Sequence, residues 1–143
     1  MSKPVVAITR PKDRAKKACE IVEKLGGTPV MAPTLDLQPV NSESLKNLVA
    51  RKDDLDWIIF TSPTTIVSLN KFYPDFIKTL DCKLAVIGNK TGKLAEKNGL
   101  TVDLMPDDFT AEGLIEEFKK REITNETIGI PRTASARPIL PEE

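Results

Sequence analysis

The sequence predicts an α/β fold in which a parallel sheet carries helices on both of its faces. Short apolar runs typical of buried strands alternate with helical patterns over all 143 residues. Such a rhythm implies parallel strands joined by right-handed crossovers. The composition agrees with a globular protein, since 40% of the residues are hydrophobic and 29% are charged.

The first elements of this pattern occupy residues 4–35. The run PVVAIT at 4–9 reads as a buried strand, and residues 12–25 follow with apolar side chains at helical spacing. Gly26–Gly27 is expected to end that helix, because the chain must enter left-handed backbone space there. The run TPVMAPTL at 28–35 is a second strand candidate, and its two prolines favour an edge or irregular strand.

Residues 36–42 are expected to form a linker, because the segment around them is the least regular of the chain and contains two prolines. Ser62 and Pro63 suit the cap and the first turn of a later helix, and Asn98–Gly99 suits a helix end. A further helix is expected to begin within residues 133–143. Helices are expected at residues 41–51, 63–72, 90–99 and 110–121, and strands at 56–60, 83–88, 100–105 and 126–132.

The charge balance and the residue usage exclude several classes of function. Lysines plus arginines equal aspartates plus glutamates at 21 each, so no global field is expected to steer the chain onto nucleic acid or an anionic membrane. The absence of histidine removes histidine-based acid–base catalysis and argues against a metal site. Cys19 and Cys82 are expected to be reduced thiols of a cytoplasmic protein, with a single disulfide as the open alternative. No run approaches the ~20 apolar residues of a membrane span.

Polar side chains without negative charge follow four of the predicted strands. Ligands of open parallel sheets bind at the carboxyl ends of the strands, and helix N-termini at that edge favour negative charge. The set therefore predicts a site for a polyanionic ligand. The competing interpretation is that these residues only cap helices. Arg10 and Arg132 argue against it, because helix capping does not require arginine. The four pairs are Thr9 and Arg10, Thr61 and Ser62, Asn89 and Thr91, and Arg132 and Thr133.

The segment from Gly88 to Leu94 resembles a nucleotide-binding loop but does not meet its requirements. A P-loop needs G-x-x-x-x-G-K-[ST], with a hydroxyl for magnesium. Here the spacing is one residue short, and Leu94 stands where the hydroxyl should be. The strand ends also lack the phosphoacceptor aspartate of a response regulator. The stretch ITRPKD lacks the glycines of a dinucleotide-binding fold.

Taken in order, these strand ends resemble the uroporphyrinogen-III synthase family. The matching segments are VAITRP, IIFTSPTTIVSL, LAVIGNKTGKLAEKNGL, TAEGLIEEF and IGIPRTASARPILPEE. The resemblance implies a two-domain α/β enzyme of tetrapyrrole and heme biosynthesis. Residues 1–35 would be the opening strand–helix–strand of domain one, residues 36–42 the linker, and residues 43–143 most of domain two.

The resemblance also implies a reaction and a set of site residues. The family's substrate is hydroxymethylbilane, a linear tetrapyrrole with eight carboxylates. Loss of water gives an electrophilic azafulvene, and ring closure inverts the distal pyrrole without a metal or an organic cofactor. The protein would mainly fold the substrate and donate a proton to the leaving oxygen. Thr91 matches the family's functional threonine, and the residues expected to bind substrate carboxylates are Arg10, Thr61, Ser62, Asn89 and Arg132.

The family pattern extends beyond this sequence. The final strand of domain two, with a tyrosine often proposed as the proton donor, and the rest of domain one have no counterpart here, and Tyr73 does not occupy that position. We therefore expect little synthase activity from these residues alone, with a complementary chain or an exchanged protomer as ways to supply the rest. The alternatives are a non-catalytic module that binds polyanions or tetrapyrroles, and a flavodoxin-like scaffold whose polar strand ends only cap helices.

Overall fold

The computed structural model describes residues 2–34 and 38–132, with only the backbone described for residue 13. The helix expected to begin within residues 133–143 lies outside these ranges. Residues 36 and 37 of the expected linker lie outside them too. The chain divides into two compact units, one up to Pro39 and one from Val40 onward. Each unit is described by itself.

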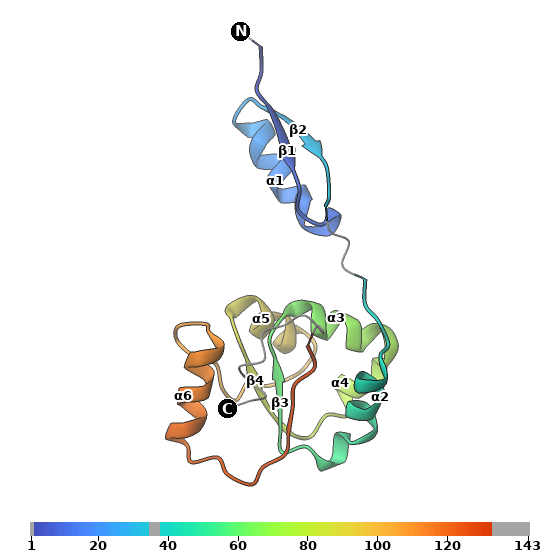
Figure 1. Cartoon of the computed structure of the whole chain (residues 1–143), viewed down its shortest axis with the longest axis vertical. Helices are drawn as coiled ribbons and strands as arrows, with labels where there is room; N and C mark the ends of the chain where they lie inside the picture. Colours follow the sequence, from blue (N-terminus) through green and yellow to red (C-terminus); the bar gives the residue numbers. More distant parts are fainter. Residues whose placement is uncertain (1, 35–37, 133–143) are drawn as a thin grey trace. The chain divides into compact units, whose positions relative to one another are not determined.

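The first unit is a strand–helix–strand piece. Strand β1 (Val5–Ile8) pairs in parallel with β2 (Thr28–Met31), in a register that runs from Val5 opposite Thr28 to Ile8 opposite Met31. Helix α1 (Lys12–Lys24) connects the two strands (Figure 1). Gly26 ends the helix at a φ of 83°, which confirms the predicted entry into left-handed space.

Few apolar side chains of this first unit are buried. Its buried hydrophobic residues are Ile8 and Ala15, among the residues that the structure describes. Val5 is 70% exposed and Leu25 is 82% exposed. A single helix against a two-stranded sheet leaves one face of the sheet uncovered, so the unit does not by itself bury a core.

The second unit is built on a parallel sheet of three strands. Strand β3 (Trp57–Phe60) lies at the centre, between β4 (Lys83–Val86) and β5 (Ile128–Gly129). The register places Trp57 opposite both Lys83 and Ile128. The chain moves from β3 outward to β4 and then returns to the other side of β3. The strand order therefore reverses between β3 and β5, and such a switch point is where open α/β sheets bind their ligands.

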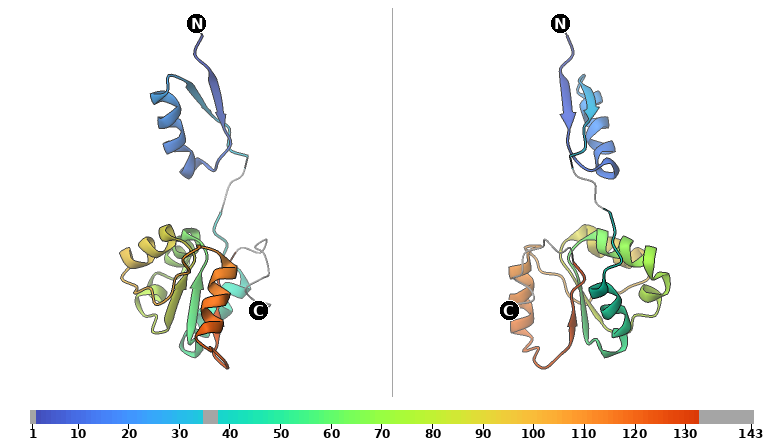
Figure 2. Two further views of the ribbon diagram at one scale, coloured as in Figure 1. Left: turned by 90° about the vertical axis from the view of Figure 1, so that its left-hand side faces the viewer. Right: turned by 45° about the vertical axis from the view of Figure 1, so that its right-hand side comes forward.

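Helices cover both faces of this sheet, as the alternating pattern predicts (Figure 2). On one face, Ile58 and Phe60 lie in a hydrophobic core together with apolar side chains from the first four helices of the second unit. The other face, with Trp57 and Ile59, packs against Leu114 and Phe118 of the remaining helix. The rings of Trp57 and Phe118 meet edge to face, 5.2 Å apart and inclined by 80°. The helices are α2 (Glu43–Ala50), α3 (Pro63–Phe72), α4 (Pro74–Lys78), α5 (Asn89–Lys97) and α6 (Ala111–Lys120), with a short 3-10 helix at Lys52–Asp54.

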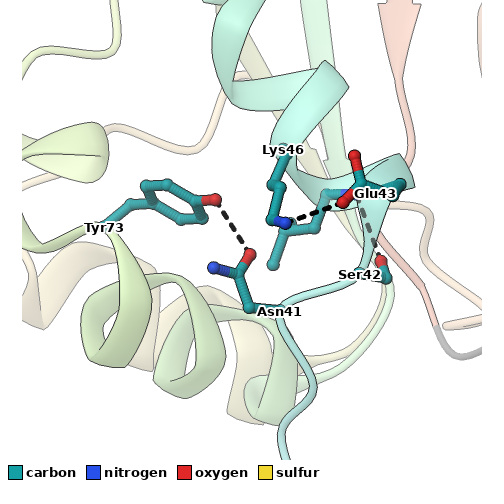
Figure 3. Close-up of polar contacts among 6 residues, drawn as sticks. Asn41, Ser42, Glu43, Lys46 and Tyr73 are labelled. Atoms are coloured by element: carbon teal, nitrogen blue, oxygen red, sulfur yellow. Dashed lines mark hydrogen bonds and ion pairs between the residues drawn. The ribbon is translucent and has the colours of Figure 1, made fainter.

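The chain enters the second unit through a set of polar contacts (Figure 3). The Tyr73 hydroxyl donates a hydrogen bond of 2.8 Å to Oδ1 of Asn41, which ties the entering segment to the end of α3. Ser42 caps α2 by accepting from the Leu45 N–H at 3.2 Å. Lys46 pairs with Glu43 at 2.7 Å on the outer face of that helix.

Two expected strands differ from the prediction. The strand expected at 100–105 is wrong, because in that segment only Leu104 pairs, through a single parallel bridge to Ala85. The Asp103 carboxylate takes the Leu84 N–H that a neighbouring strand would have bonded through its backbone. The strand expected at 126–132 is shortened to β5. Across the described ranges no helix is long and apolar enough to cross a bilayer.

Candidate functional site

Strands β3 and β4 leave the sheet side by side. Phe60 lies opposite Val86 in the register, and the Ile87 N–H donates to the Phe60 carbonyl at 3.1 Å. The turn at Thr61 and the turn at Gly88 are therefore neighbours at the carboxyl edge of the sheet. The structure thus brings together two of the four predicted strand ends.

Ser62 acts as a helix cap. Its Oγ accepts from the Thr64 N–H at 3.2 Å, and Pro63 takes the first helical position, as the sequence predicts. The hydroxyl proton of Ser62 has no acceptor among the described residues. For this residue the capping interpretation holds, and a ligand contact through the O–H remains compatible with it.

The side chains of Thr61 and Asn89 do not cap a helix in the way that Ser62 does. Thr61 is half-buried and Asn89 is exposed. Within the described ranges, neither the Thr61 hydroxyl nor the Asn89 amide makes a side-chain hydrogen bond, in contrast to Ser62 and to the capping residue Thr110. Capping therefore does not account for these two side chains, and they can contact a ligand at this edge.

Thr91 lies deeper than the other predicted site residues. It is 2% exposed and is the buried polar side chain of the described core. Helix α5 carries it inward with Gly92 and Ala95, on the face that packs against the sheet. A ligand could therefore contact Thr91 only through an atom that enters between the β4–α5 turn and the sheet.

The N-terminus of α5 is open. Gly88 is its N-cap residue, at a φ of 90°, and no side chain caps the helix. A Cβ added at Gly88 would meet nothing within 4 Å, so the turn faces free space. The uncapped first-turn N–H groups make a favourable environment for an anion.

Helix α6 has an N-terminus of the opposite kind. The Thr110 hydroxyl accepts from the Gly113 N–H at 2.9 Å, and the Asp108 carboxylate accepts from the Thr110 N–H at 3.2 Å. A carboxylate of the chain itself thus already serves the positive end of this helix. An anionic ligand therefore has more reason to approach α5 than α6.

The third strand end lies on the other side of β3. The Thr65 hydroxyl of α3 lies 3.5 Å from the Pro131 carbonyl, which links the exit of β5 to the helix after β3. Arg132 follows directly and is exposed. Thr133 lies outside the described residues. Arg132 thus belongs to the same edge as Thr61, within one unit.

Arg10 belongs to the first unit. It is exposed and follows β1, where the Thr9 carbonyl accepts from both the N–H and the hydroxyl of Thr34 at 3.3 Å. These contacts close the β1 and β2 exits around Thr9 and leave Arg10 on the surface. The structure describes Arg10 within its own unit only.

Thiol chemistry does not fit this site. Burial is the main cause that raises the pKa of the Cys82 thiol to about 11, with nearby aspartates adding to it. Cys82 also lies just before β4, at the opposite end of that strand from Gly88 and the N-terminus of α5. A thiol of this kind stays protonated at neutral pH and is a poor nucleophile.

Lys90 and Lys93 are exposed on the first turns of α5 and were not among the predicted site residues. The available signal was the lack of an acidic residue in a first turn that also lacks a capping side chain. Acidic residues are favoured there because of the helix dipole. These two cations stand beside Asn89 at the open end of the helix.

Fold and site together define an α/β protein with a parallel sheet whose strand exits carry hydroxyl, amide and cationic side chains. The sequence profile described as "Uroporphyrinogen-III synthase HemD" matches residues 16–143. The chain therefore belongs to the uroporphyrinogen-III synthase family. This membership does not favour the flavodoxin-like scaffold as the explanation of the strand ends.

Individual relatives agree with this assignment. The chain is 41% identical over 138 residues to a Methanothermobacter thermautotrophicus protein provisionally named uroporphyrinogen-III synthase, covering 95% of this chain and 54% of the relative. It is 28% identical over 142 residues to the uroporphyrinogen-III synthase of Chlorobaculum parvum, covering 96% of this chain and 56% of the relative. The chain thus spans about half the length of the curated relatives it matches.

A solved structure shares the fold. The uroporphyrinogen III synthase of the extremely thermophilic bacterium Thermus thermophilus superposes with a TM-score of 0.56 at 18% identity, over 97% of this chain and 55% of that chain. At this identity the likeness concerns the arrangement of helices and strands. It confirms the predicted α/β class with parallel strands.

Proposed function

We propose that this chain supplies the ligand-binding sheet edge of a uroporphyrinogen-III synthase. The ligand would be hydroxymethylbilane, and the reaction its cyclisation with loss of water and inversion of the distal pyrrole. The observation that carries the proposal is the pairing of the β3 and β4 exits, which sets Thr61 beside the open N-terminus of α5. Family membership supports the substrate class.

In this proposal the edge works mainly by holding and folding the substrate. Thr61, Ser62 and Asn89 would donate hydrogen bonds to carboxylates, and Arg10 and Arg132 would add charge. Donors fixed by secondary structure favour the folded geometry in which the ring closes, which is where an enzyme of this type gains rate. Thr91 would bond an oxygen that reaches the base of the β4–α5 turn, including the leaving hydroxyl.

The proposed division of the chain follows the sequence: residues 1–35 in one domain, 36–42 as the linker and 43–143 in the second domain. The exposed β1 and α1 side chains of the first unit support the idea that further polypeptide covers it. Because the relatives are about twice as long, we expect little type III isomer from these 143 residues alone. A complementary chain or an exchanged protomer would raise the yield, and the setting would be cytoplasmic.

Binding is the first test. Uroporphyrin, an octacarboxylic tetrapyrrole, is titrated against the chain and followed by fluorescence anisotropy. Thr61→Val and Asn89→Ala should each weaken binding by about three- to tenfold, the loss expected for one hydrogen bond. Matched controls are Thr101→Val and Asn47→Ala, two exposed residues away from the carboxyl edge, which should bind as the parent does.

The titration also decides between the proposals. No binding of uroporphyrin by the parent chain, or equal binding by the Thr61 and Asn89 variants, would defeat the proposed site. Turnover of hydroxymethylbilane to the type III isomer, measured with a complementary chain added and compared with a full-length relative, then separates an enzyme from the non-catalytic binding module. No observation on the molecule favours that module. Thr91→Val, which keeps the buried shape and removes the hydroxyl, should lower turnover more than binding.

A further inference from the structure

The second unit has a cavity of about 350 Å³ with aromatic walls. Val49 near the end of α2, Phe72 at the end of α3 and Phe76 in α4 line it. Tyr73 adds a third ring, and its hydroxyl is already engaged by Asn41 (Figure 3), which leaves the ring as the part of Tyr73 that lines the cavity. Small-molecule sites are typically hollows of this kind, with mostly apolar walls and few polar groups.

This cavity lies at the strand entrances. Its lining residue Lys52 precedes β3, and its lining residue Thr79 precedes β4. Thr61 and Asn89, in contrast, follow those two strands. The cavity is therefore separate from the site proposed at the carboxyl edge of the sheet.

Lys52 brings a poorly compensated positive charge to the cavity. Its side chain is 24% exposed, against 49% for Lys46 and 69% for Lys120. Its ammonium group donates to the neutral Thr79 hydroxyl at 2.8 Å, whereas the Asp53 carboxylate lies 3.9 Å away and is 97% exposed. Lys46 and Lys120 instead meet glutamates at 2.7 and 2.9 Å. An ammonium group that has lost most of its water is stabilised by a closer anion.

Thr79 fixes the direction of this ammonium group. Its hydroxyl donates to carbonyls of the preceding helical turn, the nearer being that of Asp75 at 2.7 Å, so its oxygen accepts from Lys52. Among the described residues, the ammonium group makes one hydrogen bond with its three protons. A carboxylate that enters the cavity can accept from the other two.

The remaining charges favour one carboxylate over several, and over a cation. Asp75 also lines the cavity but is exposed, so water screens its charge more than that of Lys52. A second carboxylate of a ligand would meet Asp75 without a second cation in the lining. A cationic ligand would meet Lys52, and the Phe72 ring already carries the Lys71 ammonium 5.4 Å from its centroid.

We propose that this cavity binds a small aromatic monocarboxylate. The ring of the ligand packs among Phe72, Tyr73 and Phe76, and its carboxylate accepts hydrogen bonds from Lys52. One aromatic ring with one acidic arm matches the aromatic walls and the single buried cation, whereas a tetrapyrrole with eight carboxylates is too large and too highly charged. The inference goes beyond the proposed function and does not depend on it.

The test titrates phenylacetate into the isotope-labelled full chain and follows the amide chemical shifts. Shifts should gather at residues 49–52 and 72–79 and spare Thr61 and Asn89, with a Kd of about 1–10 mM for a ligand of this size. Phenylacetamide, which has nearly the same shape without the charge, should bind about tenfold more weakly. Phenylmalonate, which adds a second carboxylate, should bind no more tightly than phenylacetate.

Three variants assign the charges. Lys52→Met keeps the apolar stem, so it should weaken phenylacetate binding about tenfold and leave phenylacetamide binding unchanged, which also shows that the variant is folded. Lys78→Met is the matched control, since Lys78 is exposed on α4 and outside the lining, and it should bind phenylacetate as the parent does. Asp75→Asn should strengthen phenylacetate binding by about two- to fivefold and phenylmalonate binding by more.

Several results would overturn the inference. They are no shifts at about 20 mM phenylacetate, shifts centred outside residues 49–52 and 72–79, and equal binding of phenylacetate by the parent and by Lys52→Met. Tighter binding of phenylethylamine than of phenylacetate would mean that the cavity selects cations and would overturn it too. None of these results bears on the carboxyl edge, which the uroporphyrin titration tests separately.

Discussion

The backbone N–H of Leu84 donates a hydrogen bond of 2.8 Å to the carboxylate of Asp103. Asp103 and Leu104 in turn donate their N–H groups to the Leu84 carbonyl, at 2.9 and 3.2 Å, and the Val86 N–H donates to the Leu104 carbonyl at 3.0 Å. A side chain thus replaces one backbone partner along the edge of β4. The edge strand is satisfied without a full neighbouring strand.

Replacement of Asp103 by alanine should therefore destabilise the second unit. We expect the free energy of unfolding to fall by about 1–2 kcal/mol, because the Leu84 N–H loses its partner. Urea unfolding followed by the fluorescence of Trp57, the one tryptophan of the chain, measures this. Asp107→Ala, exposed in the same segment, is the control and should change stability by less than about 0.5 kcal/mol. Equal effects of the two variants would contradict the assigned role.

Much of the fold could be predicted from the sequence, because the decisive patterns are local. The apolar run at Trp57–Phe60 and the Ser62–Pro63 helix start are explained by burial and by capping, and both are confirmed. The strand expected at 100–105 failed for a non-local reason. Its apolar residues fit a strand, but the Asp103 side chain competes with the backbone for Leu84. The alternation of apolar and polar residues does not reveal which side chain will accept a backbone hydrogen bond from a neighbouring strand.

The site was predictable in part. Topology brings parallel strand exits to one edge, so the grouping of Thr61 with Asn89 follows from the element order. The burial of Thr91 did not follow, because helical phase relative to the core depends on how α5 packs on the sheet. The uncapped N-terminus of α5, with its two lysines, could be recognised only from the structure, which shows that Gly88 is the N-cap residue. Arg10 and Arg132 remain predictions as ligand contacts.

Gly129 in β5 is needed for its size. A Cβ there would lie 2.7 Å from Cδ1 of Leu48 and 3.2 Å from Cδ1 of Leu55. Gly129→Ala should therefore lower the free energy of unfolding by about 1–3 kcal/mol through overpacking between β5 and α2. The measurement is again urea unfolding.

Gly92 provides a comparison of opposite sign. It is buried in α5, and its added Cβ would meet only Val86 at 3.5 Å and Met105 at 3.8 Å, which are ordinary contacts. Gly92→Ala should thus raise stability by up to about 1 kcal/mol through helix propensity. A similar loss for both alanine variants would show that size at residue 129 is not the cause.

Gly113 and Asp108 should be energetically coupled. The Asp108 carboxylate occupies the space that a Cβ at residue 113 would need. Gly113→Ala alone should gain little, because its helix propensity is offset by displacement of Asp108 from the Thr110 N–H. In an Asp108→Ala background the same change should stabilise by about 0.5–1 kcal/mol. A double-mutant cycle measures the difference, and additive effects would exclude the contact.

The thiol of Cys82 should make stability fall at alkaline pH. Burial raises its pKa from 9.0 to about 11 in the folded chain. Below about pH 9 the thiol is protonated in both the folded and the unfolded state, so it contributes no pH dependence. Between about pH 9 and 11 only the unfolded chain releases the proton, which favours unfolding.

The test uses a Cys19→Ser background, in which Cys82 is the one thiol of the chain. Unfolding free energies are measured from pH 8 to pH 11, and the Cys82→Ala variant reports the slope due to all other groups. The chain with Cys82 should show the steeper decline, and its folded thiol should react with iodoacetamide at pH 8 more slowly than a free cysteine. Parallel curves for the two chains, together with rapid alkylation, would mean that Cys82 is not shielded in the way its position beside the core requires.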